Sequence, residues 1–278
     1  IRDRYSNMPY SDVGNYTFDT YLDYVQQGIY LWENSPYVKN YPELYFLNYV
    51  LFHRTNDEEI KPCRTYFWKK IKDKVQGKAM VEAALEINHW CAGEVMYQGT
   101  DMRTGSALEI YRSGVGRCGE EAVFVVNVMR SAGIPARPVY VPRWSHCDDN
   151  HAWVEVWCDG DWHYLGACEP EAVLDKGWFT NAASRAMMIG SRWYDRAMPD
   201  EKVIGKDGMN RIINLLGKYA KTRWITITVE DLDGTPAAGA KVRAEVMNYG
   251  EFSPIAIMEA DKNGCISFET GFGSLLIL

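Results

Sequence analysis

A cysteine and a histidine that lie 33 residues apart are the first candidates for chemistry in this sequence. Cys118 stands in "GRCGEEAVFVVNVMRSAG", directly before a long apolar run, and His151 opens "HAWVEVW". The sequence predicts a helix from the cysteine onward, because small and acidic residues precede the apolar ones and Gly133 follows them. The N–H groups and the dipole at a helix start favour a thiolate and can hold an oxyanion. Cys118 is therefore predicted to be an activated nucleophile.

A nucleophilic thiol needs a base, and an imidazole is the usual partner. His151 stands at the start of a predicted strand, from which a side chain can project into a cleft. His53 and His89 lie in the predicted helical half, where a histidine is more often a surface or satisfied core residue. His146 falls in a polar loop, and His163 falls on the second strand of a predicted hairpin. His151 is therefore the predicted base.

A third group should orient the imidazole, and the geometry of the hairpin decides which carboxylate can reach it. With a three-residue loop at 158–160, Ala167 lies opposite His151 and Glu169 is the diagonal neighbour on the same face. A two-residue loop at 159–160 turns Glu169 away. The prediction of Glu169 thus requires an odd-length loop or a bulge. The other carboxylates near the hairpin are Asp148, Asp149, Glu155, Asp159, Asp161 and Glu171.

Two stretches, "GRCGEEAVFVVNVMRSAGIPARPVY" and "NHAWVEVWCDGDWHYLGACEPE", together resemble the core of the transglutaminase-like superfamily. That superfamily includes transglutaminases, peptide N-glycanases and many bacterial proteins thought to be peptidases. The resemblance covers roughly residues 80–175. It implies a papain-like α+β fold and a triad of Cys118, His151 and Glu169. One departure is that "CEP" stands where the superfamily has aspartate and proline, so that glutamate replaces aspartate.

The function that the resemblance implies is thiol-dependent acyl transfer on peptide or amide substrates, through an acyl-enzyme on Cys118. Hydrolysis of that intermediate, as in a cysteine peptidase or amidase, is favoured by the resemblance to bacterial members. Attack by a lysine-type amine would instead make a cross-linking transglutaminase. A protein- or glycan-binding module of a cell-envelope protein, without turnover, is the alternative from another class. The expected partner is a protein or peptide substrate.

Further residues near these motifs have two interpretations each. Gln98 could supply a side-chain oxyanion donor, as a glutamine does in papain-like enzymes, or be a plain surface amide. Trp153 could touch substrate, although packing of the sheet is the favoured interpretation. A zinc site built from His146, Cys147, His151 and Cys168 can be imagined, but the spacing matches no standard pattern. No metal and no cofactor are predicted.

The composition is that of an ordinary globular protein. The chain has 278 residues, of which 47% are hydrophobic and 24% are charged, and its net charge is −7 without a basic block. Binding to nucleic acid or to an anionic membrane is therefore not expected. No apolar stretch approaches the roughly 18–20 residues that span a bilayer. The sequence shows no signal peptide at its start, lacks an initial Met and ends on "GSLLIL", so we expect an excerpt of a longer protein. Its seven cysteines are an odd number, which leaves at least one unpaired.

The pattern of apolar and polar residues along the chain predicts two domains. A transglutaminase-like domain is expected at 1–221, with a helical part at 1–80, a catalytic core at 81–195 and a last helix at "GMNRIINLLGKYAK". Residues 222–278 alternate between apolar and polar residues and predict an antiparallel meander. Their pattern "DLDGTPAAGAKV" followed by "DKNG" resembles the carboxypeptidase-regulatory-like or transthyretin-like β-sandwich, an Ig-like module that would be incomplete here. Such modules accompany secreted or cell-envelope proteins, which implies a secreted, periplasmic or cell-surface location.

Overall fold

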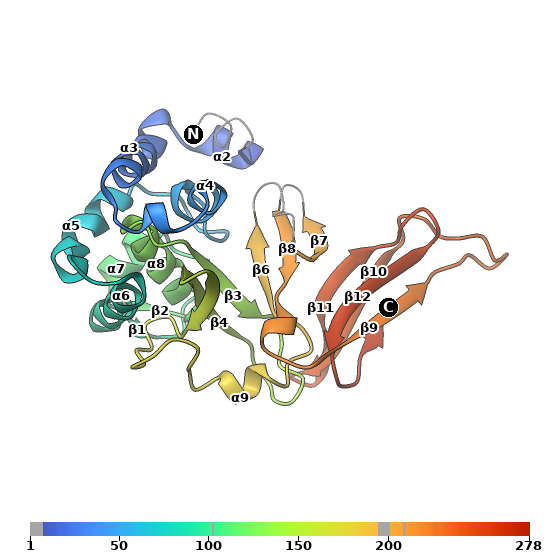
Figure 1. Ribbon diagram of the computed structural model, residues 1–278. Coiled ribbons are helices and arrows are strands. Elements are labelled where there is room, and N and C mark those ends of the chain that lie inside the picture. The colour runs from blue at the N-terminus through green and yellow to red at the C-terminus, as the bar shows by residue number, and fades with distance from the viewer. Residues whose placement is uncertain (1–7, 102, 194–200, 208–209) are drawn as a thin grey trace. The chain divides into compact units, whose positions relative to one another are not determined.

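The computed structural model describes residues 8–101, 103–193, 201–207 and 210–278 (Figure 1). It forms two compact units. Unit 1 consists of the chain up to residue 139 together with 152–177, and unit 2 consists of 140–151 and 178–278. Helices and antiparallel strands both contribute, so the fold class is α+β, as the sequence predicts. The predicted domain division after residue 221 rests on composition and stays a prediction.

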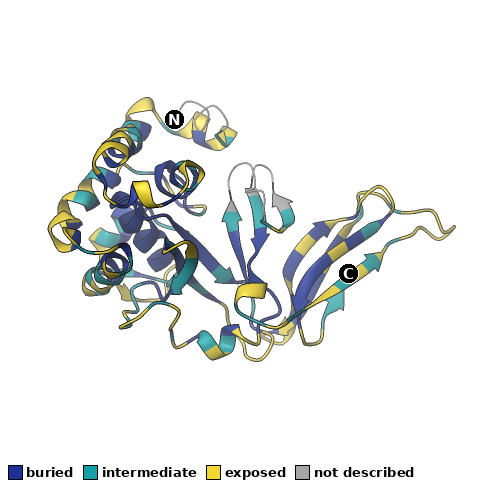
Figure 2. Cartoon of the chain, in the orientation of Figure 1, coloured by how far each residue is buried: buried dark blue, intermediate teal, exposed yellow. Residues whose placement is uncertain are grey.

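Unit 1 is mainly helical, in keeping with the helical part that the sequence predicts at 1–80. Its central element is α8, in which every residue from Glu120 to Ser131 is buried (Figure 2). Helix α8 packs against α5, α6 and α7, so the apolar run behind Cys118 is the core of the unit. The helices are α2 (Tyr10–Asn15), α3 (Phe18–Asn34), η1 (Val38–Asn40), α4 (Glu43–Phe46), the π-helical η2 (Leu47–Leu51), α5 (Arg64–Val75), α6 (Met80–Glu94), α7 (Ala107–Ser113) and α8 (Cys118–Ser131).

The strands of unit 1 include the predicted hairpin. Strands β3 (Ala136–Val141), β4 (His151–Cys158) and β5 (Asp161–Leu165) lie in the order β5-β4-β3, and β1 (Met96–Tyr97) pairs in parallel with β2 (Val115–Gly116). Cys158 pairs with Asp161, which leaves a two-residue turn. Asp159 and Gly160 both have positive φ, 52° and 91°, as a type I′ turn requires. Of the two features that the prediction of Glu169 allowed, an odd-length loop or a bulge, the odd-length loop is therefore wrong.

Unit 2 contains a second group of strands and short helical turns. They are α9 (Thr180–Ala183), β6 (Gly190–Trp193), β7 (Val203–Asp207), β8 (Asn210–Asn214) and η3 (Leu216–Lys218), with the strand order β6-β8-β7. The predicted helix at 208–221 is wrong for residues 210–214. These residues form β8 because strands on both sides, β6 and β7, satisfy its backbone groups. Gly208 and Met209 lie outside the described residues.

Two small antiparallel sheets end the chain. Strands β9 (Thr222–Thr228) and β12 (Cys265–Gly271) form one sheet, and β10 (Lys241–Asn248), β11 (Glu251–Glu259) and β13 (Leu276–Ile277) form the other in the order β11-β10-β13. Both sheets contribute to one apolar core, which includes Val242, Val246, Ile266 and Phe268. The predicted strands are present, but the predicted meander is wrong, because β9 pairs with β12 and not with the strand that follows it.

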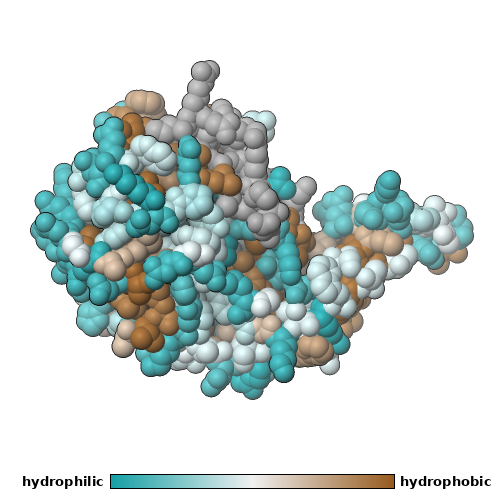
Figure 3. Space-filling model, viewed as in Figure 1, coloured by the Kyte–Doolittle hydropathy of each residue, from teal (hydrophilic) through white to brown (hydrophobic). Residues whose placement is uncertain are grey.

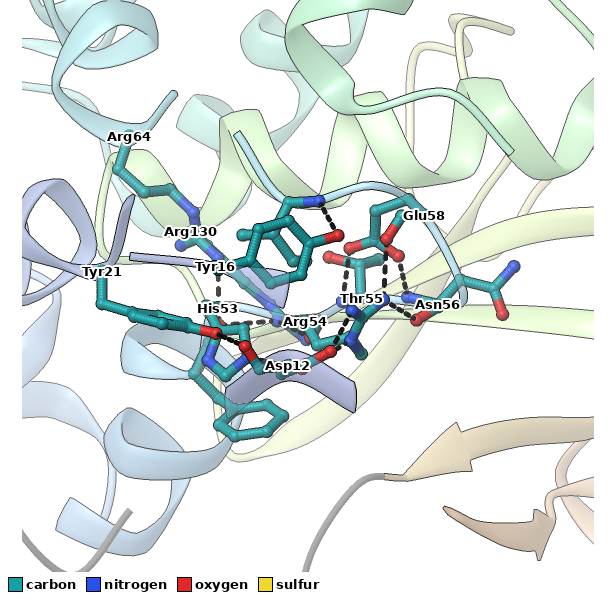
Figure 4. A network of polar contacts seen from close by, with 12 residues as sticks. Asp12, Tyr16, Tyr21, His53, Arg54, Thr55, Asn56, Glu58, Arg64 and Arg130 are labelled. Atoms are coloured by element: carbon teal, nitrogen blue, oxygen red, sulfur yellow. Dashed lines mark hydrogen bonds and ion pairs between the residues drawn. The ribbon is translucent and has the colours of Figure 1, made fainter. Parts of the chain in front are cut away.

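A buried polar network fastens α2 to the rest of unit 1 (Figure 4). The Asp12 carboxylate accepts hydrogen bonds from Arg54 Nε at 2.9 Å and contacts His53 Nε2 at 3.0 Å. Arg54 Nη1 donates to the carbonyl oxygen of Glu58 at 2.7 Å, and Arg130 Nη1 of α8 donates to that of Arg54 at 3.0 Å. Because these charges are buried and mutually bonded, they lock α2 onto the core.

The visible face of the molecule is mixed in hydropathy (Figure 3). Hydrophilic side chains cover most of the visible face, and apolar side chains gather in smaller patches between them (Figure 3). None of the helices in the described ranges is long and apolar enough to cross a bilayer. All seven cysteines lie in those ranges, and each is a thiol outside any disulfide.

Candidate active site

The turn before Cys118 is held by a carboxylate from the first turn of α8. Glu120 accepts hydrogen bonds from the backbone N–H of Arg117 at 3.2 Å and of Gly105 at 3.0 Å, and from Thr100 Oγ1 at 2.5 Å. Arg117 has an extended backbone, with φ −76° and ψ 166°, and α8 begins at the next residue. The predicted position of Cys118 at a helix start is confirmed, and Glu120 holds the backbone of the residue directly before it.

The environment of the Cys118 sulfur favours the neutral thiol. Burial raises the pKa of this thiol, and the charge of Glu121 raises it further. Hydrogen bonds from the backbone N–H groups of Ala152 and Gly119 act in the opposite direction, and burial outweighs them. The amide donors that a helix start was expected to supply are present, but the expected activation of the thiolate is wrong in sign. The resting sulfur therefore carries its proton.

His151 is the first residue of β4 and belongs to unit 2, whereas Ala152 belongs to unit 1. Its side chain is buried, with 7% of its surface exposed. The ring centroid lies 4.6 Å from that of Trp178 and 5.0 Å from that of Phe179. Burial lowers the pKa of His151 to about 4, and the charge of Asp149 partly opposes this shift. His151 is thus a neutral imidazole at physiological pH, which is the form that can accept a proton.

Glu169 lies in a tight turn that follows β5. Its backbone N–H donates to the carbonyl oxygen of Gly166 at 3.2 Å, and Cys168 within the turn has φ of 57°. Asn88 of α6 clamps this turn, since its Nδ2 donates to Gly166 O at 2.9 Å and its Oδ1 accepts from Cys168 N at 3.1 Å. The chain leaves the strand after Leu165, so this turn, rather than the loop of the hairpin, sets the direction of Glu169.

The charge of Glu169 acts on its neighbours in unit 1. Burial raises the pKa of Glu121 to about 8, and the carboxylate of Glu169 adds to that rise. Burial and the charges of Glu121 and Glu169 also raise the pKa of Cys168. Glu121, in the first turn of α8, therefore carries a proton at neutral pH. The carboxylate whose charge acts on the pKa of His151 is that of Asp149. The orienting role of Glu169 therefore stays a prediction.

The structure also describes the other candidate residues, Gln98, Trp153, His146 and Cys147. The backbone N–H of Gln98 donates to the carbonyl oxygen of Gly116, two residues before Cys118, at 2.9 Å, and the side chain of Gln98 is exposed. Its oxyanion role stays a prediction. Trp153 is fully buried, which favours the packing interpretation. The described residues hold no group of three or more His, Cys, Asp and Glu side chains that could bind a metal ion, so His146 and Cys147 join no such group.

Sequence reasoning missed several residues that shape this site. Glu120 and Glu121 were read only as helix-start residues, although two adjacent acids beside a candidate thiol are an available signal. No sequence pattern relates Asn88 to the turn that carries Glu169, or Trp178 to His151, and each contact is visible only in the fold of its own unit.

Residues 69–167 match the family model described as the transglutaminase-like superfamily. The predicted resemblance is confirmed for this stretch, which contains Cys118 and His151 and ends before Glu169. No curated protein matches the chain.

Three solved structures are similar to this chain at low identity. Red sea bream transglutaminase is 11% identical over 91% of this chain and 52% of its own, with a TM-score of 0.34. A protein of Cytophaga hutchinsonii that is named as a proposed cysteine protease is 18% identical over 54% of this chain and 57% of its own, with a TM-score of 0.32. A structure named as a TGase is 15% identical over 37% of this chain and 31% of its own, with a TM-score of 0.30. At this level of similarity the three carry no argument about the reaction.

Proposed function

We propose that this protein is a thiol acyl-transfer enzyme that acts on peptide or amide carbonyls and hydrolyses them. The observation that carries the proposal is the setting of Cys118. Its sulfur lies at the first residue of a buried helix and receives hydrogen bonds from the N–H groups of Gly119 and Ala152. The match of residues 69–167 to the transglutaminase-like superfamily supports the same reaction class.

The proposed reaction starts from a neutral thiol and a neutral imidazole. His151 takes the proton of Cys118 as the sulfur attacks the carbonyl carbon, so that a C–S bond forms while the carbonyl electron pair moves to oxygen. Backbone N–H groups at the start of α8 stabilise that oxyanion. His151 then returns the proton to the leaving amine as the C–N bond breaks, and a thioester remains on Cys118.

The second half of the reaction decides between two activities. Water, deprotonated by His151, releases the acid and restores the thiol, as in a peptidase or amidase. A lysine-type amine at the same step would form a new amide, as in a cross-linking transglutaminase. We propose hydrolysis as the main outcome. Glu169, or Asp149 in its place, would hold the imidazole in the required orientation.

The test is to trap the acyl-enzyme. The protein is mixed with an activated ester of an N-acylated peptide, quenched in acid and digested, and acylated cysteines are identified by mass spectrometry. Acylation of Cys118 should be faster than that of Cys147, an exposed thiol in the same chain that serves as the internal control. It should disappear in Cys118→Ser and fall strongly in His151→Gln. Equal acylation of both thiols would overturn the proposal and leave a module without turnover.

The fate of the thioester is then measured by adding a primary amine. Release of free acid at a rate independent of the amine supports hydrolysis, whereas a dominant amide product assigns the cross-linking reaction. The location and the carboxypeptidase-regulatory-like character of residues 222–278 also remain proposals, and they are supported by the residue pattern of the two C-terminal sheets.

A further inference from the structure

The loop that leads to His151 has no regular structure, and Ser145–Asn150 within it are exposed. It joins the end of β3 at Val141 to the start of β4 at His151. The next residue, His151, is nevertheless buried. A loop of this kind would leave a catalytic imidazole poorly fixed, unless a group outside the loop holds its backbone.

That group is the side chain of Asn248, the last residue of β10, which is 1% exposed. Its Nδ2 donates to three carbonyl oxygens of the loop: Trp144 at 3.0 Å, Cys147 at 3.1 Å and Asp149 at 3.2 Å. Its Oδ1 accepts from the N–H of Asp149 at 3.4 Å. The NH₂ group of Asn248 has two protons for these three carbonyl oxygens, so two of the oxygens share one proton. Both the NH₂ group and the oxygen of the side chain are therefore engaged in hydrogen bonds.

The loop needs this support most at Asp149. This residue has φ of 115°, a conformation that L-residues rarely adopt and that must be held by its surroundings. Asn248 contacts both the N–H and the C=O of Asp149. The carboxylate of Asp149 also accepts from the backbone N–H of Asn150 at 2.8 Å, directly before His151.

The support extends from Asn248 into the turn that follows it. The backbone N–H of Tyr249 donates to Asp148 Oδ1 at 2.5 Å. Asn248 pairs with Glu251 across the β10–β11 hairpin, and the faces of that hairpin belong to the shared C-terminal core. The loop is therefore anchored to a rigid sheet that lies about one hundred residues further along the chain.

We propose that Asn248 is a positioning residue for His151, and that the C-terminal sheets thereby form part of the catalytic apparatus. Asn248 touches neither the sulfur nor the imidazole. It fixes the backbone of residues 144–149, and through them the ring of His151 against Trp178 and Phe179 and the charge of Asp149 beside it. The proposal rests on the proposed role of His151 as the base.

The test compares Asn248→Asp with Asn214→Ala. Asn248→Asp keeps the shape of the side chain but presents oxygens to three carbonyls. Asn214 is a matched control, since it is 6% exposed in the same unit and bonds through Nδ2 to Glu269 O at 2.8 Å and through Oδ1 to Leu216 N at 3.0 Å. Two readouts are used: the pKa of His151 from an NMR titration of the histidine rings, and kcat and KM with the peptide ester.

In Asn248→Asp we expect the pKa of His151 to move toward its ordinary value, and kcat to fall at least about tenfold while KM changes much less. Asn214→Ala should lower the melting temperature but leave the pKa of His151 and kcat near those of the wild type. Equal effects in both variants, or none in Asn248→Asp, would overturn the proposal. If Asn248→Asp does not fold, Asp148→Ala, which removes only the contact with Tyr249, should give a smaller shift of the same sign. No shift there would count against it.

The NMR titration separates this proposal from the proposed function. If the wild type forms no acyl-enzyme, the proposed reaction fails, yet the pKa of His151 in the variants still reports whether Asn248 holds its ring.

Discussion

Two buried histidines, His53 and His151, show how similar burial serves different purposes. Burial lowers the pKa of both. His53 is 0% exposed and contacts the Asp12 carboxylate at 3.0 Å, within a network that also binds Arg54. His151 is 7% exposed and lies against Trp178, whose own side chain is 64% exposed. His53 is surrounded by polar partners inside the core, whereas His151 contacts Trp178, which is itself exposed to solvent.

Burial and a shifted pKa therefore do not identify a catalytic histidine by themselves. His53 contacts a carboxylate, as a triad would require. That carboxylate belongs to Asp12 of α2, and it also forms an ion pair with Arg54 (Figure 4). His151 lies at a strand start, next to the residue whose N–H bonds to the Cys118 sulfur. The place of His151 in the sequence, beside the residue whose N–H bonds to Cys118, distinguishes the two better than the shift of their pKa values.

The largest expected effect comes from removing each imidazole. His151→Gln should lower the rate of Cys118 acylation by about a thousandfold, because general-base catalysis contributes on that order. His53→Gln should leave the rate near the wild-type value and lower stability instead. Stopped-flow acylation and chemical denaturation measure the two effects. A rate loss in His53→Gln as large as that in His151→Gln would erase the distinction.

The next effect concerns the partner of His53. Burial by itself would raise the pKa of Asp12, but hydrogen bonds from His53 and Arg54 outweigh it and lower that pKa to about 2. The stability from this ionised carboxylate is therefore present above about pH 4 and is lost as the pH falls toward 2. Asp12→Asn should lower the free energy of unfolding at pH 7 by about 3 kcal/mol or more.

The control for Asp12 is Asp19→Asn in α3, because Asp19 is an exposed acid in the same part of the chain. Its substitution should change the free energy of unfolding by about 0.5 kcal/mol or less. Denaturation curves at pH 7 that coincide for the two variants would show that the network around Asp12 does not fasten α2.

A third effect follows from the lowered pKa of His151. The unfolded chain binds a proton at this residue below about pH 6.5, whereas the folded chain does so only near pH 4. The folded state therefore loses up to about 3.5 kcal/mol as the pH falls through this window, since one pKa unit is about 1.4 kcal/mol. His151→Gln should show a shallower decline of stability over the same range. Parallel curves for wild type and variant would contradict the burial of this ring.

The smallest effect tests the cover that Trp178 provides. Trp178→Ala should raise the pKa of His151 by about one unit, because water then reaches the ring. Trp224→Ala is the matched control, since Trp224 of β9 is 62% exposed and makes no ring contact with His151 among those described. An NMR titration of the histidines gives both values. Identical pKa values of His151 in the two variants would show that groups other than Trp178 exclude water from the imidazole ring.

Local patterns predicted the parts of this molecule that depend on neighbouring residues. The helix start at Cys118, the strand that opens with His151 and the helices of residues 1–100 follow from capping, alternation and amphipathic spacing. Residues 210–214 were predicted as helix because their apolar run suits either state, and pairing with β6 and β7 decides it.

The rest depends on contacts between distant segments, which one sequence does not display. The pKa of Cys118 follows the burial of its sulfur, which is a property of packing. Asn248 lies about one hundred residues from the loop that it holds, so no local pattern relates them. The turn from Gly166 to Glu169 likewise depends on Asn88 of α6.

The central claim is that a neutral Cys118 thiol is activated by a neutral His151 as the nucleophile attacks. The most direct test is the rate of Cys118 alkylation by iodoacetamide between pH 4 and 10, followed by mass spectrometry in the wild type and in His151→Gln. We predict a rate that rises steadily through neutral pH without a plateau on the acid side, and that falls at neutral pH in the variant. A plateau between pH 4 and 7, or identical profiles for the two proteins, would contradict the claim.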